Sequence, residues 1–186
     1  RKQSEVAHME SSCRNLRALN AYIQLLLDAA SQRDDPMICL ELMEIYRLLN
    51  RPVSAYGYLL RAKRLGAAVN PGVSAEMQNV LKTGDIYAAS KDPDGAYIMG
   101  SELAYYPEYF EPAVYYLQQS VENGDPHGLA ALDLGELLEA QPIHKNYFSS
   151  LAHKYFRIAT ERGNHQYLSA MHRPQNRKSI FCVGNP

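Results

Sequence analysis

The sequence predicts an all-α fold, an α-solenoid of stacked helical hairpins, on two observations. Apolar residues recur three and four positions apart, the spacing of one helix face, and no stretch shows the sustained period-two alternation of a strand. One pattern also repeats: an Ala, aromatic or large apolar residues three and four later, and a Gly at eleven, starting at Ala55, Ala113 and Ala152, with a degenerate copy from Tyr22. Such repetition is typical of solenoids, whose units bury their apolar faces by stacking.

In the N-terminal part, three helices are expected at about 12–33, 36–49 and 53–65. Apolar residues from Leu16 to Ala30 predict the first. Asp35 is placed to be the N-cap of the second, with Pro36 at its first position, and Gly66 suits the left-handed turn that closes the third.

In the C-terminal part, five helices are expected at about 74–90, 95–105, 111–123, 126–140 and 147–162. Loops rich in Pro, Gly, Asn and Asp separate several of them, and Asp125 with Pro126 repeats the Asp-Pro helix start. Residues 106–110 form a connector. The segment 164–171 looks like the start of another helix, and the chain beyond Arg173 reads as irregular.

Composition excludes several classes of protein. Hydrophobic residues make up 46% and charged residues 21% of 186 residues, the range of an ordinary folded domain. No apolar run reaches the roughly 18 residues of a transmembrane helix. A net charge of -1 gives no basis for nucleic-acid binding. The chain opens on Arg1, so we expect a processed or excised portion of a longer protein.

No motif for catalysis, a cofactor or a metal is present. The sequence lacks a P-loop, GxGxxG, GxSxG and HExxH. Only His165 and His172 share a predicted helix face, and they stand about 10.5 Å apart, too far for one zinc ion. The three cysteines, Cys13, Cys39 and Cys182, include no CxxC pair. We therefore expect no catalytic residue, cofactor or metal.

A second pattern lies on the alternate helices, in the segments 42–46, 83–87, 99–103 and 134–138. Three of the four contain a glycine inside a predicted helix, which costs about 1 kcal/mol relative to alanine. Close approach of a partner helix would explain Gly84, Gly100 and Gly135, and small alanines such as Ala159 on the other helix would serve the same contact.

These patterns together resemble the Sel1-like repeat, a relative of the tetratricopeptide repeat, over about 35–171. The fullest match pairs Leu134–Leu138 with Ala152–Gly163. The resemblance implies a right-handed solenoid with the first helices lining its inner face. The long interval between the copies at 55 and 113 implies an irregular unit at about 70–110. We expect an extension at 1–11, the repeat array at 12–172 and an irregular tail at 173–186.

Residues 92–163, with the aromatic connector, are also similar to the repeat lipoproteins of alginate secretion complexes. That similarity implies a periplasmic or outer-membrane-associated scaffold for exopolysaccharide export, whose partners are the export porin and other periplasmic components. Two alternatives stay open. One is an adaptor of the same repeat type, cytoplasmic or secreted, with an unrelated partner. The other, weaker one is a cell-wall hydrolase, although the cysteine-rich relatives that suggest it carry paired cysteines that this chain lacks.

Two sets of residues are candidates for binding a protein partner. Two positions after the first residue of each first-helix segment stand Glu44, Asp85, Ser101 and Glu136, an acidic register suited to basic side chains. A solvated helix face would show the same residues.

The second set is the aromatic cluster of the connector, Tyr105, Tyr106, Tyr109 and Phe110, which flanks Pro107. Exposed aromatic residues of this kind are typical of protein hot spots. Alternatively, the connector folds back over the helix ends and buries them.

Overall fold

The computed structural model describes the backbone of residues 2–72, 74–75, 79, 91–125, 127–141 and 145–164, and side chains from Ser12 onward apart from Cys13, Lys145 and Asn146. Throughout these residues the chain is helical and contains no strand, which confirms the all-α prediction. The helices are α1 (Lys2–Gln32), α2 (Pro36–Leu48), α3 (Pro52–Arg64), α6 (Pro93–Leu103), α7 (Phe110–Asn123), α8 (Leu129–Glu139) and α9 (Lys145–Glu161), with a short 3-10 helix η1 (Pro107–Tyr109).

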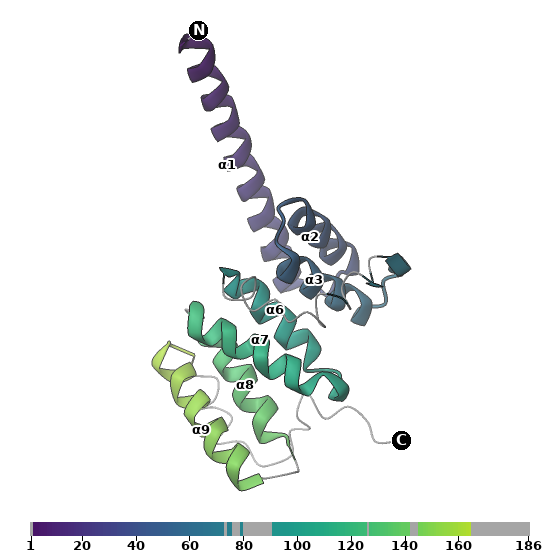
Figure 1. Cartoon of the computed structure of the whole chain (residues 1–186), viewed down its shortest axis with the longest axis vertical. Coiled ribbons are helices and arrows are strands. Elements are labelled where there is room, and N and C mark those ends of the chain that lie inside the picture. Colours follow the sequence, from purple (N-terminus) through teal and green to yellow (C-terminus); the bar gives the residue numbers. More distant parts are fainter. Residues whose placement is uncertain are drawn as a thin grey trace.

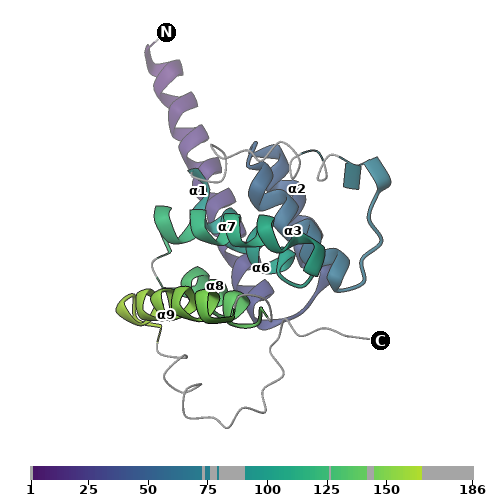
Figure 2. The same ribbon diagram turned by 60° about the horizontal axis from the view of Figure 1, so that its bottom comes forward.

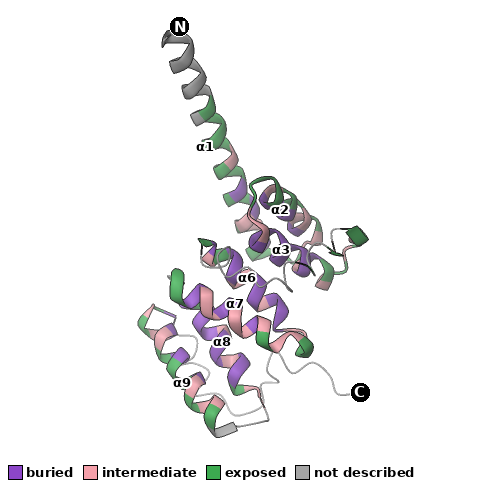
Figure 3. Ribbon diagram, in the orientation of Figure 1, coloured by how far each residue is buried: buried purple, intermediate pink, exposed green. Residues whose placement is uncertain are grey.

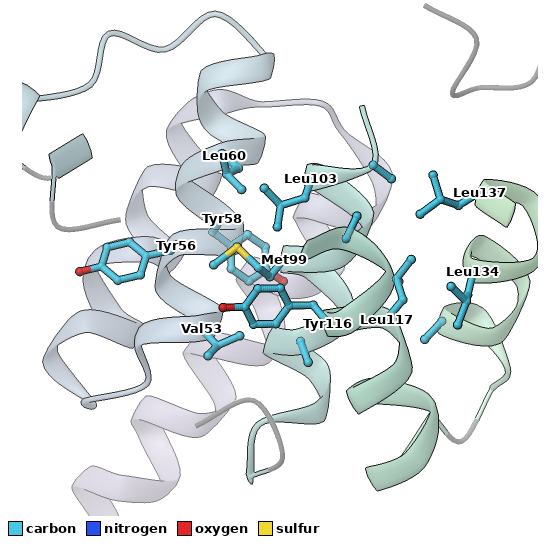
Figure 4. Packing of buried hydrophobic residues seen from close by; sticks show 14 of the residues in the cluster. Val53, Tyr56, Tyr58, Leu60, Met99, Leu103, Tyr116, Leu117, Leu134 and Leu137 are labelled. Atoms are coloured by element: carbon cyan, nitrogen blue, oxygen red, sulfur yellow. The ribbon is translucent and has the colours of Figure 1, made fainter. Parts of the chain in front are cut away.

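The helices pack in adjacent pairs, α2 with α3, α6 with α7 and α8 with α9 (Figure 1). Neighbouring pairs meet where α3 packs on α6 and α7 packs on α8. One hydrophobic core runs through these contacts. In Figure 4, Met99 of α6 lies beside the rings of Tyr58 of α3 and Tyr116 of α7. The predicted helix at 74–90 lies almost wholly outside the described residues.

Glycine and alanine allow the helices of a pair to approach closely, as the sequence predicts. A Cβ added at Gly100 would lie 2.7 Å from Leu117 Cγ, and one at Gly135 would lie 2.5 Å from Phe156 Cε1. Both distances are shorter than a van der Waals contact. The alanines of the second-helix pattern are fully buried, namely Ala55, Ala62, Ala113, Ala152 and Ala159. Gly84 lies outside the described residues.

Local signals fix most helix ends. The Asp35 carboxylate accepts a hydrogen bond from Met37 N at 2.8 Å, which confirms the predicted N-cap. The closing glycine of each repeat adopts a positive φ, 93° at Gly66 and 89° at Gly163, a conformation that L side chains rarely adopt. The expected helix at 95–105 instead spans Pro93–Leu103, because Asp92 caps it and Pro93 takes its first position.

The expected start of a helix at 126 was wrong, because α8 begins at Leu129. Gly128 adopts a φ of 65° ahead of it, and the Asp125 carboxylate accepts a hydrogen bond from Ala131 N at 3.0 Å. Asp125 therefore accepts a hydrogen bond from a residue six positions later, in the first turn of α8. It is not the N-cap residue of α8, as Asp35 is of α2.

The first helix is longer than its apolar pattern predicts. It begins at Lys2 instead of about residue 12, and no proline or glycine interrupts Lys2–Gln32. Among its described side chains, Ile23, Leu26 and Ala30 are buried against the other helices, and Leu19 and Leu27 pack beside them. The N-terminal part projects away from the remaining helices in both views (Figure 1 and Figure 2), and within the part of α1 whose burial Figure 3 colours, the buried residues lie near its C-terminal end.

Candidate functional site

The predicted aromatic connector forms a compact turn between α6 and α7. Tyr106 N donates to Leu103 O at 2.9 Å as α6 ends, and Tyr109 N donates to Tyr106 O at 2.9 Å across η1. The rings of Tyr106 and Tyr109 meet edge to face, with centroids 6.3 Å apart. Tyr105, Tyr106 and Tyr109 are all half-buried. The structure therefore brings the three predicted tyrosines together and leaves part of each exposed.

An ion pair between α3 and α6 fixes the start of the connector. Arg64 binds Glu102 through two hydrogen bonds, Nε to Oε2 at 2.7 Å and a terminal nitrogen to Oε1 at 3.0 Å. The Glu102 side chain is buried, and its hydrogen bonds raise the pKa of Arg64 above the ordinary value. The Arg64 guanidinium also lies over the Tyr105 ring, 4.5 Å from its centroid. Tyr105 is thus held against both helices.

Two aromatic residues at the start of α9 extend the cluster. Phe148 meets Phe110 edge to face at 6.1 Å, and Tyr147 packs on Phe148 at 5.5 Å. Tyr147 is 68% exposed, more than the tyrosines of the connector. We call the following set the aromatic surface: Tyr105, Tyr106, Tyr109, Phe110, Tyr147 and Phe148.

Sequence reasoning missed the residues that α9 contributes to this surface and the Arg64 of α3 that lies over Tyr105. Tyr147 and Phe148 precede the Ala152 copy of the repeat, at positions where the repeat pattern requires no aromatic residue. Two adjacent aromatic residues outside the repeat pattern were the sequence signal that could have indicated the contribution of α9. Nothing in the spacing of Arg64 and Glu102 indicates their pairing, because they belong to different helical pairs.

The acidic register does not gather into one site among the described residues. Glu44 is exposed on α2, where Arg47 lies 3.7 Å away, and Glu136 is half-buried on α8. Ser101 holds the one position of the register that is not acidic. Its hydroxyl donates a hydrogen bond to Asp133 inside the fold. Asp85 lies outside the described residues. The register stays a prediction.

Asp133, on α8, is a half-buried acid that the sequence does not single out. Its Oδ2 atom accepts a hydrogen bond from Ser101 Oγ at 2.5 Å, and Tyr97 also hydrogen-bonds to its carboxyl group. Burial raises the pKa of Asp133 to about 7. The hydrogen bond from Ser101 opposes that rise, and the charges of Glu136 and Asp125 add to it. Asp133 therefore titrates close to neutral pH.

Replacing Asp133 by asparagine should flatten the pH dependence of stability. Since the folded pKa lies above the unfolded value of 3.8, the folded state binds the extra proton between those values, and wild-type stability falls as pH rises from about 4 to 7. The asparagine keeps an acceptor for Ser101 and carries no charge. At pH 8 the variant should be more stable by about 1–2 kcal/mol, a value below the full shift because water screens a half-buried group.

Urea unfolding at pH 5 and pH 8 measures this difference. Glu44→Gln, at an exposed position, serves as the control and should follow the wild-type profile. If Asp133→Asn keeps the wild-type slope between the two pH values, Asp133 is already ionised in the folded protein at pH 5.

No metal-binding group of three or more His, Cys, Asp or Glu side chains occurs within the described part of the chain. His127 and His153 are exposed there. Cys39 is buried and unbridged, and its burial raises the pKa of the thiol. None of the described helices has the length and apolar character needed to cross a membrane.

Comparison of the chain with protein-family models, with curated proteins and with solved structures found no match in any of the three.

Proposed function

We propose that this chain is a right-handed solenoid of Sel1-like hairpins and serves as a non-catalytic scaffold for protein–protein interaction. The succession of pairs supports it, since α2–α3, α6–α7 and α8–α9 follow in chain order and each pair packs on the next. The fully buried alanines and the glycines at the crossings support it as well. Solenoids present extended surfaces, which suits them to bind other proteins.

The aromatic surface is the observation that carries the proposal. Tyrosine and arginine are the side chains that dominate binding energy at protein interfaces, because they combine a large contact area with a polar group. Here Arg64 and the turn hold the rings in place, so that little side-chain entropy is lost on binding. Exposed Glu108 and Glu111 stand next to them. The complementary partner surface has an apolar centre and basic residues at its edge.

The proposed setting is exopolysaccharide export, at the periplasmic face of an outer membrane. Its support is the similarity of residues 92–163 to the alginate-secretion lipoprotein AlgK, in the order of segments and in the aromatic connector. The partners in that setting are the outer-membrane porin and periplasmic export components. An adaptor in the cytoplasm with an unrelated partner is the competing assignment that the experiment below separates.

Replacing Tyr106 and Tyr147 together by alanine should abolish partner capture. The tagged chain is incubated in parallel with detergent-solubilised membranes, periplasmic extract and cytoplasmic extract of the source organism, and bound proteins are identified by mass spectrometry. The wild-type chain should retain a porin and periplasmic proteins, and the double variant at least about tenfold less, a loss of roughly 1.4 kcal/mol or more.

Leu48→Ala is the matched control, because Leu48 is 85% exposed and lies on α2, outside the aromatic surface. It should bind as the wild type does, and circular dichroism should show equal helix content in all three proteins. Equal capture by the double variant would rule out the aromatic surface. Retention of cytoplasmic proteins alone would favour the adaptor.

A further inference from the structure

Helix α1 carries a second apolar face besides the one that packs on the core. Ile23, Leu26 and Ala30 face the core and are buried. Successive residues turn by about 100° around a helix, so another set of side chains is centred about a third of a turn from these, with Tyr22 and Ala29 at its edge nearest the core. We call this set the outer stripe: Arg14, Ala18, Ala21, Tyr22, Leu25 and Ala29.

The outer stripe is open to solvent apart from Ala29, which is half-buried. Leu25 is 66% exposed and Tyr22 is 43% exposed, although the Tyr22 hydroxyl hydrogen-bonds to Glu41 of α2. Ala18 and Ala21 are exposed as well. Six of the eight large hydrophobic residues that are exposed in the described chain belong to α1, α2 or the residue that follows α2. On α1 itself, Tyr22 and Leu25 adjoin Ala18 and Ala21, and a contiguous apolar patch of this kind is typical of a contact with another molecule.

The positions of the outer stripe are symmetric about the midpoint between Ala21 and Tyr22. Ala18 and Leu25 stand at equal distances on either side of that point, and so do Arg14 and Ala29. If a second α1 lies antiparallel with its midpoint at the same level, Ala21 meets Tyr22 of the second copy and Ala18 meets Leu25. Each large side chain then faces a small one, the alternation that lets two helices interdigitate.

Charge selects the same arrangement. Asp28 is exposed and stands on the same flank of the stripe as Arg14, and its carboxylate accepts a hydrogen bond from Gln24 at 2.9 Å. In a two-fold symmetric pair, a contact of one residue with another occurs twice. Antiparallel helices therefore bring Arg14 of each copy to Asp28 of the other. A parallel pair would instead place Arg14 against Arg14.

We propose that two copies of this chain associate through α1 as an antiparallel, two-fold symmetric helix pair. The helix extends about 45 Å over its 31 residues, and its N-terminal part has no other element beside it in Figure 1. In this pair the N-terminal half of each helix runs along the outer stripe of the other, beside the half that packs on the core, so the two helical bodies lie on either side of the midpoint. An isolated helix gains little stability on its own, and packing on a second copy supplies it.

Sedimentation equilibrium of the whole chain tests the association, across a concentration series that spans the micromolar range. The wild type should be a dimer at high concentration, and Leu25→Glu should raise the dissociation constant at least about tenfold. Leu129→Glu is the matched control, because Leu129 is 38% exposed and lies on α8, outside both the outer stripe and the aromatic surface. A monomeric wild type, or equal weakening by Leu129→Glu, overturns the proposal.

Charge reversal tests the antiparallel order. Arg14→Asp and Asp28→Arg should each weaken the dimer about tenfold, because each creates two like-charge contacts across the pair. The double reversal Arg14→Asp with Asp28→Arg restores opposite charges and should return the dissociation constant to within about threefold of the wild type. Both positions are exposed, so circular dichroism should show unchanged helix content. A double variant weaker than either single one overturns this arrangement.

Discussion

Replacing Arg64 by alanine is expected to destabilise the fold by about 3 kcal/mol. The substitution leaves the Glu102 carboxylate, 5% exposed, without its two hydrogen bonds from Arg64. A buried carboxylate without a partner must either stay charged at a high desolvation cost or take up a proton. Arg61 still offers Glu102 a positive charge, since its Nε lies 4.0 Å from Glu102 Oε1. The expected loss of stability is therefore at the lower end of the range for breaking a buried ion pair.

Urea unfolding measures the effect of Arg64→Ala against Arg47→Ala. Arg47 forms an exposed pair with Glu44 at 3.7 Å, and removing it should cost less than about 0.5 kcal/mol. Adding Glu102→Leu to Arg64→Ala should recover part of the loss, because it removes the unpaired carboxylate. If Arg64→Ala and Arg47→Ala cost the same, solvent reaches Glu102 and the pair does not hold α3 to α6.

Replacing Gly100 by leucine is expected to cost about 3 kcal/mol, at the upper end for overpacking. The first added carbon already lies 2.7 Å from Leu117 Cγ and 2.9 Å from the Leu117 backbone nitrogen. A side chain can rotate away, but the backbone of α7 can give room only if the two helices separate. The change should lower the melting temperature and the α6–α7 contact should be lost first.

Gly100→Ala separates packing from helix propensity. Propensity alone favours alanine in a helix by about 1 kcal/mol, whereas the contact with the α7 backbone predicts a net loss of stability. Gly72→Leu is the control, because Gly72 is exposed, and it should stay within about 0.5 kcal/mol of the wild type. A stabilised Gly100→Ala variant would contradict the close approach of α6 and α7.

Local chemistry explains which parts of the fold the sequence predicts. An N-cap such as Asp35, a closing glycine such as Gly66 and a helix-internal glycine such as Gly100 each act within a few residues or through the repeat pattern itself. The extent of α1 does not follow from apolar spacing, because its first turns need only helix-forming residues and the absence of a breaker.

The candidate site was predictable only in part, for a related reason. The three tyrosines of the connector lie within five residues of one another, so the sequence alone shows that they are neighbours. Phe148 reaches Phe110 only through the packing of α9, and Ser101 finds Asp133 across two helical pairs. Contacts between pairs depend on the offset of one hairpin against the next, which no single segment encodes.

Helix α1 is anchored near its C-terminal end, so a small rotation there displaces its N-terminal end by a larger distance. It is held at one end, through Ile23, Leu26 and Ala30 and through the hydrogen bond from Arg61 to the carbonyl of Ala30 at 3.0 Å. For a rigid rod with a rise of 1.5 Å per residue, a rotation of about 10° at Ala30 moves the N-terminal tip by roughly 7 Å. Small adjustments around Arg61 thus become large displacements at the tip, and a force on the tip acts first on the contact between α1 and α2.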